Sequence, residues 1–86
     1  MIVKVGHNHI EDGERGCPNS CAVALAVSEA SGYYCEVGHD YILVHGAHRA
    51  YYDTPQPVRE WIDRFDGGTV VEPFEFELTA ESTMGD

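Results

Sequence analysis

The sequence predicts an α+β fold in which two helices pack on one face of a small, mostly antiparallel sheet. Short stretches with β-branched or alternating apolar residues recur along the chain, and two longer stretches carry helix signals. Their order is β-α-β-β-β-α-β, which is compatible with a ferredoxin-like arrangement that has one extra strand. Because the chain has 86 residues, we expect one domain over residues 1–78 and a frayed tail at 79–86.

The predicted strands share β-branched, aromatic or alternating residues. The segment YILVH at 41–45 is apolar on both faces, which is typical of a strand in a central position in a sheet. In HRAYYD, alternation places Ala50 and Tyr52 on the opposite face from Arg49 and Tyr51. In PFEFEL, the phenylalanines point inward and the glutamates outward. The expected strands are residues 1–5, 33–37, 41–45, 48–53 and 73–78.

The first helix is predicted from about Cys21 to Ser31. The polar segment before it, at 6–16, indicates a loop or a single helical turn. Asn19 or Ser20 can serve as the N-cap of the helix, and Gly32 follows its end, where a left-handed residue is favoured. The first two turns are apolar on all sides. Such a helix is expected to be buried on most of its sides.

The second helix is predicted over residues 54–66. Thr54 can cap it, and the prolines lie in its first turn, where they are tolerated. One apolar stripe with i, i+3, i+4 and i+7 spacing runs along it, and this stripe predicts the face that enters the core. The stripe consists of Val58, Trp61, Ile62 and Phe65.

The charge balance restricts the class of partner. The chain has 15 acidic and 5 basic side chains, a formal net charge of −10. Nucleic acids and anionic lipids are bound mainly through lysine and arginine, so neither a nucleic acid nor a membrane is expected as a partner. The acidity fits ordinary solubility first, and otherwise a basic protein partner or mimicry of the charge of a nucleic acid. Three cysteines, an N-terminus without a long apolar run and no membrane-length segment together predict a cytoplasmic protein.

Four short segments form a recognisable pattern: HIEDG at 9–13, CAVALA at 21–26, FDGG at 65–68 and PFEFEL at 73–78. This pattern resembles that of a family of small, uncharacterised proteins carried by bacteriophages and prophages. The resemblance implies a phage setting in the cytosol of a host cell, and it implies no particular activity. One position departs from the family pattern, since Ala22 stands where members tend to have proline.

A zinc site is one hypothesis for the N-terminal segment. Cys17 and Cys21 form a C-x3-C pair, and His7 and His9 lie just upstream. Four nitrogen and sulfur ligands of this kind suit tetrahedral zinc. The alternative is a buried Cys21 with solvated histidines, in which case no cofactor is needed.

A reactive thiol and an anion site are two further hypotheses for the same segment. Cys21 lies at a helix N-terminus, where a thiolate is stabilised, and Cys17 could resolve its sulfenic acid or close a C-x3-C disulfide. The neighbouring acidic side chains oppose this, so an enzyme is the less favoured interpretation. The open N–H groups of residues 20–23, together with Arg15, Asn19 and Ser20, could bind a phosphate or carboxylate, unless Asn19 or Ser20 caps the helix instead.

The tyrosines suggest an interaction surface. Five tyrosines are more than so small a core can take up, so some are expected on the sheet face away from the helices. That face could bind a partner or a second copy of the chain, although ordinary cross-strand pairs explain it equally well. We therefore expect a non-enzymatic binding protein that sequesters or blocks a host protein or a small signalling ligand, with a counter-defence role as one option. The expected partner residues are Tyr33, Tyr34, Tyr41, Tyr51 and Tyr52.

Overall fold

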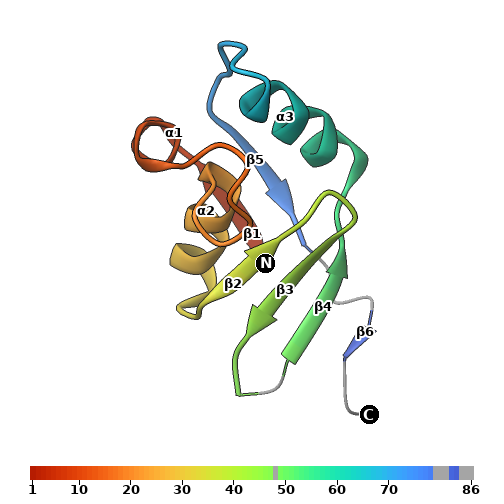
Figure 1. The fold of residues 1–86 in the computed structure, drawn as a ribbon. Helices are drawn as coiled ribbons and strands as arrows, with labels where there is room; N and C mark the ends of the chain where they lie inside the picture. Colours follow the sequence, from red (N-terminus) through yellow and green to blue (C-terminus); the bar gives the residue numbers. More distant parts are fainter. Residues whose placement is uncertain (48, 79–81, 84–86) are drawn as a thin grey trace.

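The fold was taken from a computed structural model, which describes residues 1–47, 49–78 and 82–83. It combines helices and antiparallel strands, which confirms the predicted α+β class. The elements in chain order are β1 (Ile2–Val5), α1 (His7–Asp12), α2 (Ala22–Ser31), β2 (Cys35–Val37), β3 (Tyr41–His45), β4 (Arg49–Asp53), α3 (Gln56–Asp66), β5 (Phe74–Glu77) and β6 (Ser82–Thr83) (Figure 1).

The strands form two antiparallel sheets and not the single sheet that we expected. One sheet pairs β1 with β5, and the other has the order β2-β3-β4-β6. Helix α2 packs against both β1 and β2, so it separates the first strand from the second sheet. A helix that is apolar on all sides can pack against two strands at once. The ferredoxin-like arrangement, which requires one continuous sheet, is therefore not formed by the described strands.

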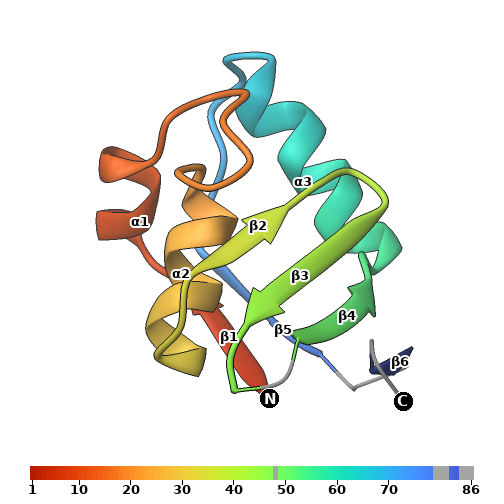
Figure 2. The same cartoon turned by 60° about the horizontal axis from the view of Figure 1, so that its bottom comes forward.

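The core lies between the two sheets and is completed by α2 and α3 (Figures 1 and 2). Val3 and Val5 enter it from β1, and Phe74 and Phe76, their partners on β5, pack beside them. The glutamates of β5 are exposed, so the alternation predicted for this strand is confirmed. The larger sheet contributes alternate residues along β2 and β3, namely Cys35, Val37, Ile42 and Val44.

Helix α2 starts one residue later than expected and has a different cap. Its N-cap is Cys21, whose Sγ accepts a hydrogen bond from the backbone N–H of Ala24 at 3.4 Å. Asn19 and Ser20 lie in the preceding turn, so the prediction that one of them caps the helix is wrong. The predicted C-terminus is confirmed, because Gly32 follows the helix with φ +79°, in the left-handed region that favours glycine.

Helix α3 presents the predicted stripe to the core, with Val58, Trp61, Ile62 and Phe65 all buried. The rings of Trp61 and Phe65 stack with centroids 5.5 Å apart, and the indole N–H of Trp61 donates to the carbonyl of Glu72 at 2.9 Å. Thr54 does not cap this helix. Its hydroxyl instead donates to the carbonyl of Gly38, which fixes the turn between β2 and β3.

The two ends of the chain differ in their contacts. Residues 7–12 form the short helix α1, where we expected a loop or a single turn, and this helix packs on α2. The described part of the tail, Ser82–Thr83, pairs with β4 as the strand β6. The rest of the predicted frayed tail, residues 79–81 and 84–86, lies outside the described residues.

Candidate functional site

The candidate site is the face of the larger sheet that points away from the core. Cross-strand partners share a face, so the pairing of Leu43 with Glu36 and with Tyr51 places these three together. Tyr41 and His45 are two residues from Leu43 along β3 and therefore join them. Among the described residues no helix covers this face, which looks toward the viewer in Figures 1 and 2.

Aromatic rings dominate this surface. The rings of Tyr41 and Tyr51 stack with centroids 5.1 Å apart and an interplanar angle of 9°. The ring of Tyr34, just before β2, lies 5.2 Å from that of His45 at a tilt of 45°. Leu43, between the two ring pairs in the register, is only 8% exposed although it points out of the core. We call Tyr34, Tyr41, Leu43, His45 and Tyr51 the aromatic face.

Acidic groups border the aromatic face. His45 Nε2 lies 3.3 Å from a carboxylate oxygen of Glu36. Asp53 pairs with Tyr41 across the sheet and is exposed, and Arg49 pairs with His45 at the other end. The border therefore combines two carboxylates with one guanidinium.

The five predicted tyrosines do not share one surface. Tyr34, Tyr41 and Tyr51 belong to the aromatic face. Tyr52 pairs with Ile42 on the inner side of the sheet and packs against the core, opposite Tyr51 as its alternation indicated. Tyr33 lies in the turn after α2 and is 48% exposed.

Sequence reasoning missed two members of the aromatic face, Leu43 and His45. The segment YILVH was interpreted as apolar on both faces, so only its tyrosine was considered for a partner surface. The signal that could have found the other two is the period of two along the strand, which puts Tyr41, Leu43 and His45 on one side.

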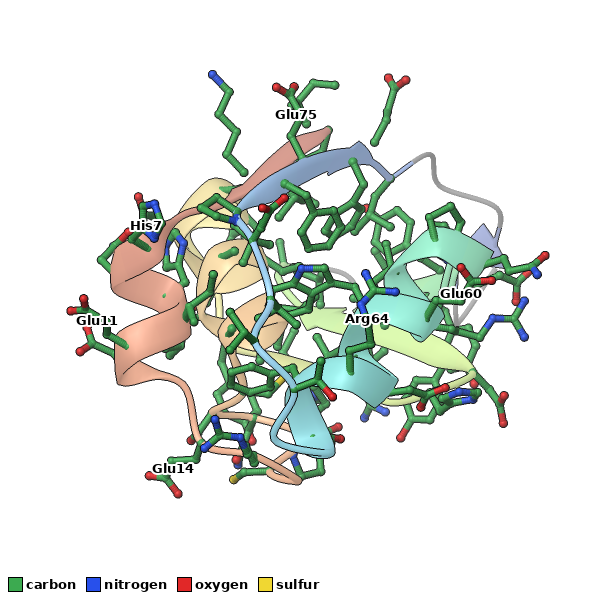
Figure 3. All side chains as sticks on the ribbon, turned by 90° about the horizontal axis from the view of Figure 1, so that it is seen from above. His7, Glu11, Glu14, Glu60, Arg64 and Glu75 are labelled. Carbon is green, nitrogen blue, oxygen red and sulfur yellow. The ribbon has the colours of Figure 1, made fainter. Side chains whose placement is uncertain are left out.

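The predicted zinc ligands are not brought together. His9 is buried in α1, where its Nδ1 accepts the N–H of Gly6 at 2.9 Å and its Nε2 lies 2.6 Å from a carboxylate oxygen of Glu29. His7 points away from the body of the molecule (Figure 3). Across the described ranges, no three side chains of His, Cys, Asp or Glu are placed to hold a metal ion. His9 thus anchors α1 to α2.

The predicted anion site is also dispersed. Arg15 donates from Nε to the carbonyl of Phe65 at 2.9 Å and lies over the ring of that residue, at the C-terminal end of α3. Asn19 donates to the hydroxyl of Tyr34 at 2.9 Å. The N–H groups of Ser20 and Cys21 both point to the carbonyl of Cys17. These groups therefore bond within the protein and do not converge on the N-terminus of α2.

The thiols of Cys21 and Cys35 are held in their neutral form. Burial raises the pKa of Cys21 above its ordinary value, and hydrogen bonds from the helix backbone only partly oppose this. Burial raises the pKa of Cys35 to about 11. A nucleophile needs a thiolate, so this environment opposes the reactive Cys21 that the helix N-terminus suggested.

A pocket of about 210 Å³ opens where the loop before α2, the β2–β3 turn and α3 meet. Its lining includes Cys17, Cys21, His39, Asp63 and Asp66. His39 Nε2 lies 3.3 Å from a carboxylate oxygen of Asp63. Cys17 is the more exposed of the two cysteines, since Cys21 is only 5% exposed. The pocket therefore gives solvent a route to this cysteine pair.

Comparisons with known proteins were made at three levels. No protein-family model, no curated protein and no solved structure matches this chain. Within the described ranges, no helix combines the length and the apolar character that crossing a lipid bilayer requires.

Proposed function

We propose that this chain is a non-enzymatic binding protein whose aromatic face holds a basic protein. In line with its resemblance to small phage proteins, it would act in the cytosol of a host cell by sequestering or blocking that partner. The observation that carries the proposal is the uncovered aromatic face itself: two ring pairs around Leu43 on the side of the sheet opposite to the core.

The chemistry of this surface suits a protein partner. Tyrosine offers a large contact area with a polar tip and loses little conformational entropy on binding. Tyr34 is 52% exposed, and its hydroxyl is already oriented by Asn19. A ring that is positioned before binding costs less to immobilise in a complex.

The negative net charge of the chain favours a partner protein with a positive net charge. A net charge of −10 attracts a basic protein over long distances and speeds its encounter. Glu36 and Asp53 bring this negative charge to the border of the aromatic face. A lysine or arginine of the partner can pair with these carboxylates while the rings cover the apolar part of the contact.

The proposal is tested by quantitative affinity capture from a bacterial lysate with the double variant Tyr34→Ala/Tyr41→Ala. We expect the unmodified chain to capture a protein with a basic isoelectric point and the variant to retain at most about a tenth of it, since aromatic anchors dominate such contacts. Raising the salt concentration should weaken capture, because the attraction is partly electrostatic.

The matched control is Ile2→Ala/Glu75→Ala, which removes two exposed side chains from the other sheet (Figure 3 shows Glu75 there). This control should capture as much as the unmodified chain. Equal capture by the Tyr34/Tyr41 variant, or a partner set that is acidic on average, would contradict the proposal.

A further inference from the structure

We propose that Cys17 and Cys21 form a reversible disulfide when the protein reacts with hydrogen peroxide. We further propose that this disulfide changes the position of the Tyr34 ring on the aromatic face. The disulfide is a property of the isolated chain. Its regulatory consequence rests on the proposed function.

The backbone already holds the two cysteines at a suitable separation. The N–H of Cys21 donates to the carbonyl of Cys17 at 2.9 Å, an i to i+4 bond that closes a single turn before α2. One such turn separates its first and last Cα atoms by about 6 Å, which lies within the usual range for a disulfide. The Cα separation therefore permits a disulfide once the two side chains turn toward each other.

The side chains face the same space. Both cysteines line the pocket between the loop, the β2–β3 turn and α3. Cys17 is partly exposed, and its Sγ donates to Oδ1 of Asn19 at 3.2 Å. Cys21 is buried, and its Sγ accepts the N–H of Ala24. A small oxidant therefore reaches the sulfur of Cys17 first. Cys21 is the thiol that then reacts with the oxidised Cys17 to form the disulfide.

The chemistry balances in two steps. The sulfur of Cys17 attacks hydrogen peroxide, an S–O bond forms as the O–O bond breaks, and the thiol proton of Cys17 leaves with the released hydroxide as one water. Cys21 then loses its proton to solvent, and its thiolate attacks the sulfenic acid of Cys17; an S–S bond forms as the S–O bond breaks, and the hydroxide that leaves takes up a proton as a second water. Because burial keeps most of Cys21 protonated, this second step is slow. The two thiols lose two electrons and the peroxide gains them. A dithiol reductant reverses the reaction.

A chain of hydrogen bonds links this pair to the aromatic face. Cys17 donates to Oδ1 of Asn19, and Nδ2 of the same Asn19 donates to the hydroxyl of Tyr34 at 2.9 Å. The disulfide removes the thiol hydrogen of Cys17 and turns its side chain toward Cys21. Asn19 then loses one of the bonds that orient it, so the position of the Tyr34 ring changes with the oxidation state.

The disulfide is tested on the purified full chain, treated with hydrogen peroxide, denatured, alkylated and cleaved after glutamate. Cleavage after Glu14, Glu29 and Glu36 separates residues 15–29 from residues 30–36, which carry Cys35. We expect peptide 15–29 to be unalkylated and 2 Da lighter than the dithiol form, with Cys35 alkylated. Uptake of two alkyl groups by peptide 15–29, or a bond to Cys35, would overturn the proposal.

The link to Tyr34 is tested by NMR of the same isolated chain with labelled tyrosines. Peroxide should shift the ring resonance of Tyr34 and leave that of Tyr52, on the inner side of the sheet, in place. The control is Cys17→Ser, which keeps a donor to Asn19 and cannot form the disulfide, so its Tyr34 resonance should not move. A disulfide without a Tyr34 shift would refute the regulatory part, whereas a failure of the proposed function would appear only in partner capture.

Discussion

At the residue scale, burial withdraws from solvent several side chains whose types suggest chemistry. Cys21 and Cys35 are 5% and 2% exposed. His9, which is 7% exposed, has both ring nitrogens in hydrogen bonds. Residue types that suggest chemistry in the sequence therefore serve packing and anchoring in the fold. Cys17 remains as the thiol that solvent can reach.

Cys35 gives a prediction for the dependence of stability on pH. Its pKa rises from the ordinary 9.0 to about 11 in the folded protein. Between these values the unfolded chain releases the proton and the folded chain keeps it, so the free energy of unfolding falls as pH rises through this window. Urea unfolding at pH 8, 9, 10 and 11 measures the slope.

The control for this slope is Cys35→Ser, because a hydroxyl can still donate to the carbonyl of Ala24 as the thiol does. Serine does not titrate in this window, so the variant should lose stability less steeply with pH than the unmodified chain. Identical slopes for the two proteins would show that Cys35 has no such role.

At the scale of elements, the short helix α1 is fixed by a close approach to α2. A Cβ at Gly13, which follows α1, would lie 2.5 Å from the backbone nitrogen of Ala22 and 2.8 Å from the carbonyl oxygen of His9. Backbone atoms cannot yield to such a contact as a flexible side chain can. Gly32, after α2, has open space around it and is required only for its positive φ.

This difference predicts an order for two glycine substitutions. Gly32→Ala should cost about 1–2 kcal/mol, the usual cost of a left-handed alanine. Gly13→Ala should cost about 3 kcal/mol, since α1 must move away from α2. Denaturant unfolding of both variants checks this. A Gly13→Ala protein that is as stable as Gly32→Ala would show that α1 and α2 do not pack so closely.

The elements show which parts of the fold the sequence could predict. Local patterns were sufficient for α3 and β5, because their apolar spacing shows directly which side enters the core. The split into two sheets depends on how α2 divides its apolar surface between β1 and β2, which periodicity does not encode. Capping by Cys21 was missed because serine and asparagine stood beside it and are the commoner caps.

The candidate site could be predicted only in part for a similar reason. Tyrosine-rich strands indicated a surface, and alternation separated Tyr51 from Tyr52 correctly. The proximity of Tyr34 to His45 and of Asn19 to Tyr34 depends on how loops and strands meet in space. Contacts of this kind are set by the tertiary fold.

At the scale of the whole molecule, the two sides of the larger sheet differ in what packs against them. The inner side holds the core, together with α2, α3 and the β1–β5 pair (Figures 1 and 2). The outer side carries the aromatic face and is left uncovered by the described helices. In so small a domain, the helices and the second sheet pack on one side of the larger sheet and leave the aromatic face exposed.

Site-specific photo-crosslinking in host cells tests whether the aromatic face contacts a basic protein. A benzoylphenylalanine is placed at position 34 in one protein and at position 75, on the opposite sheet, in another. Irradiation should join a basic protein to position 34 and none to position 75. An absence of adducts at position 34, or equal adducts at both positions, would contradict the proposed contact.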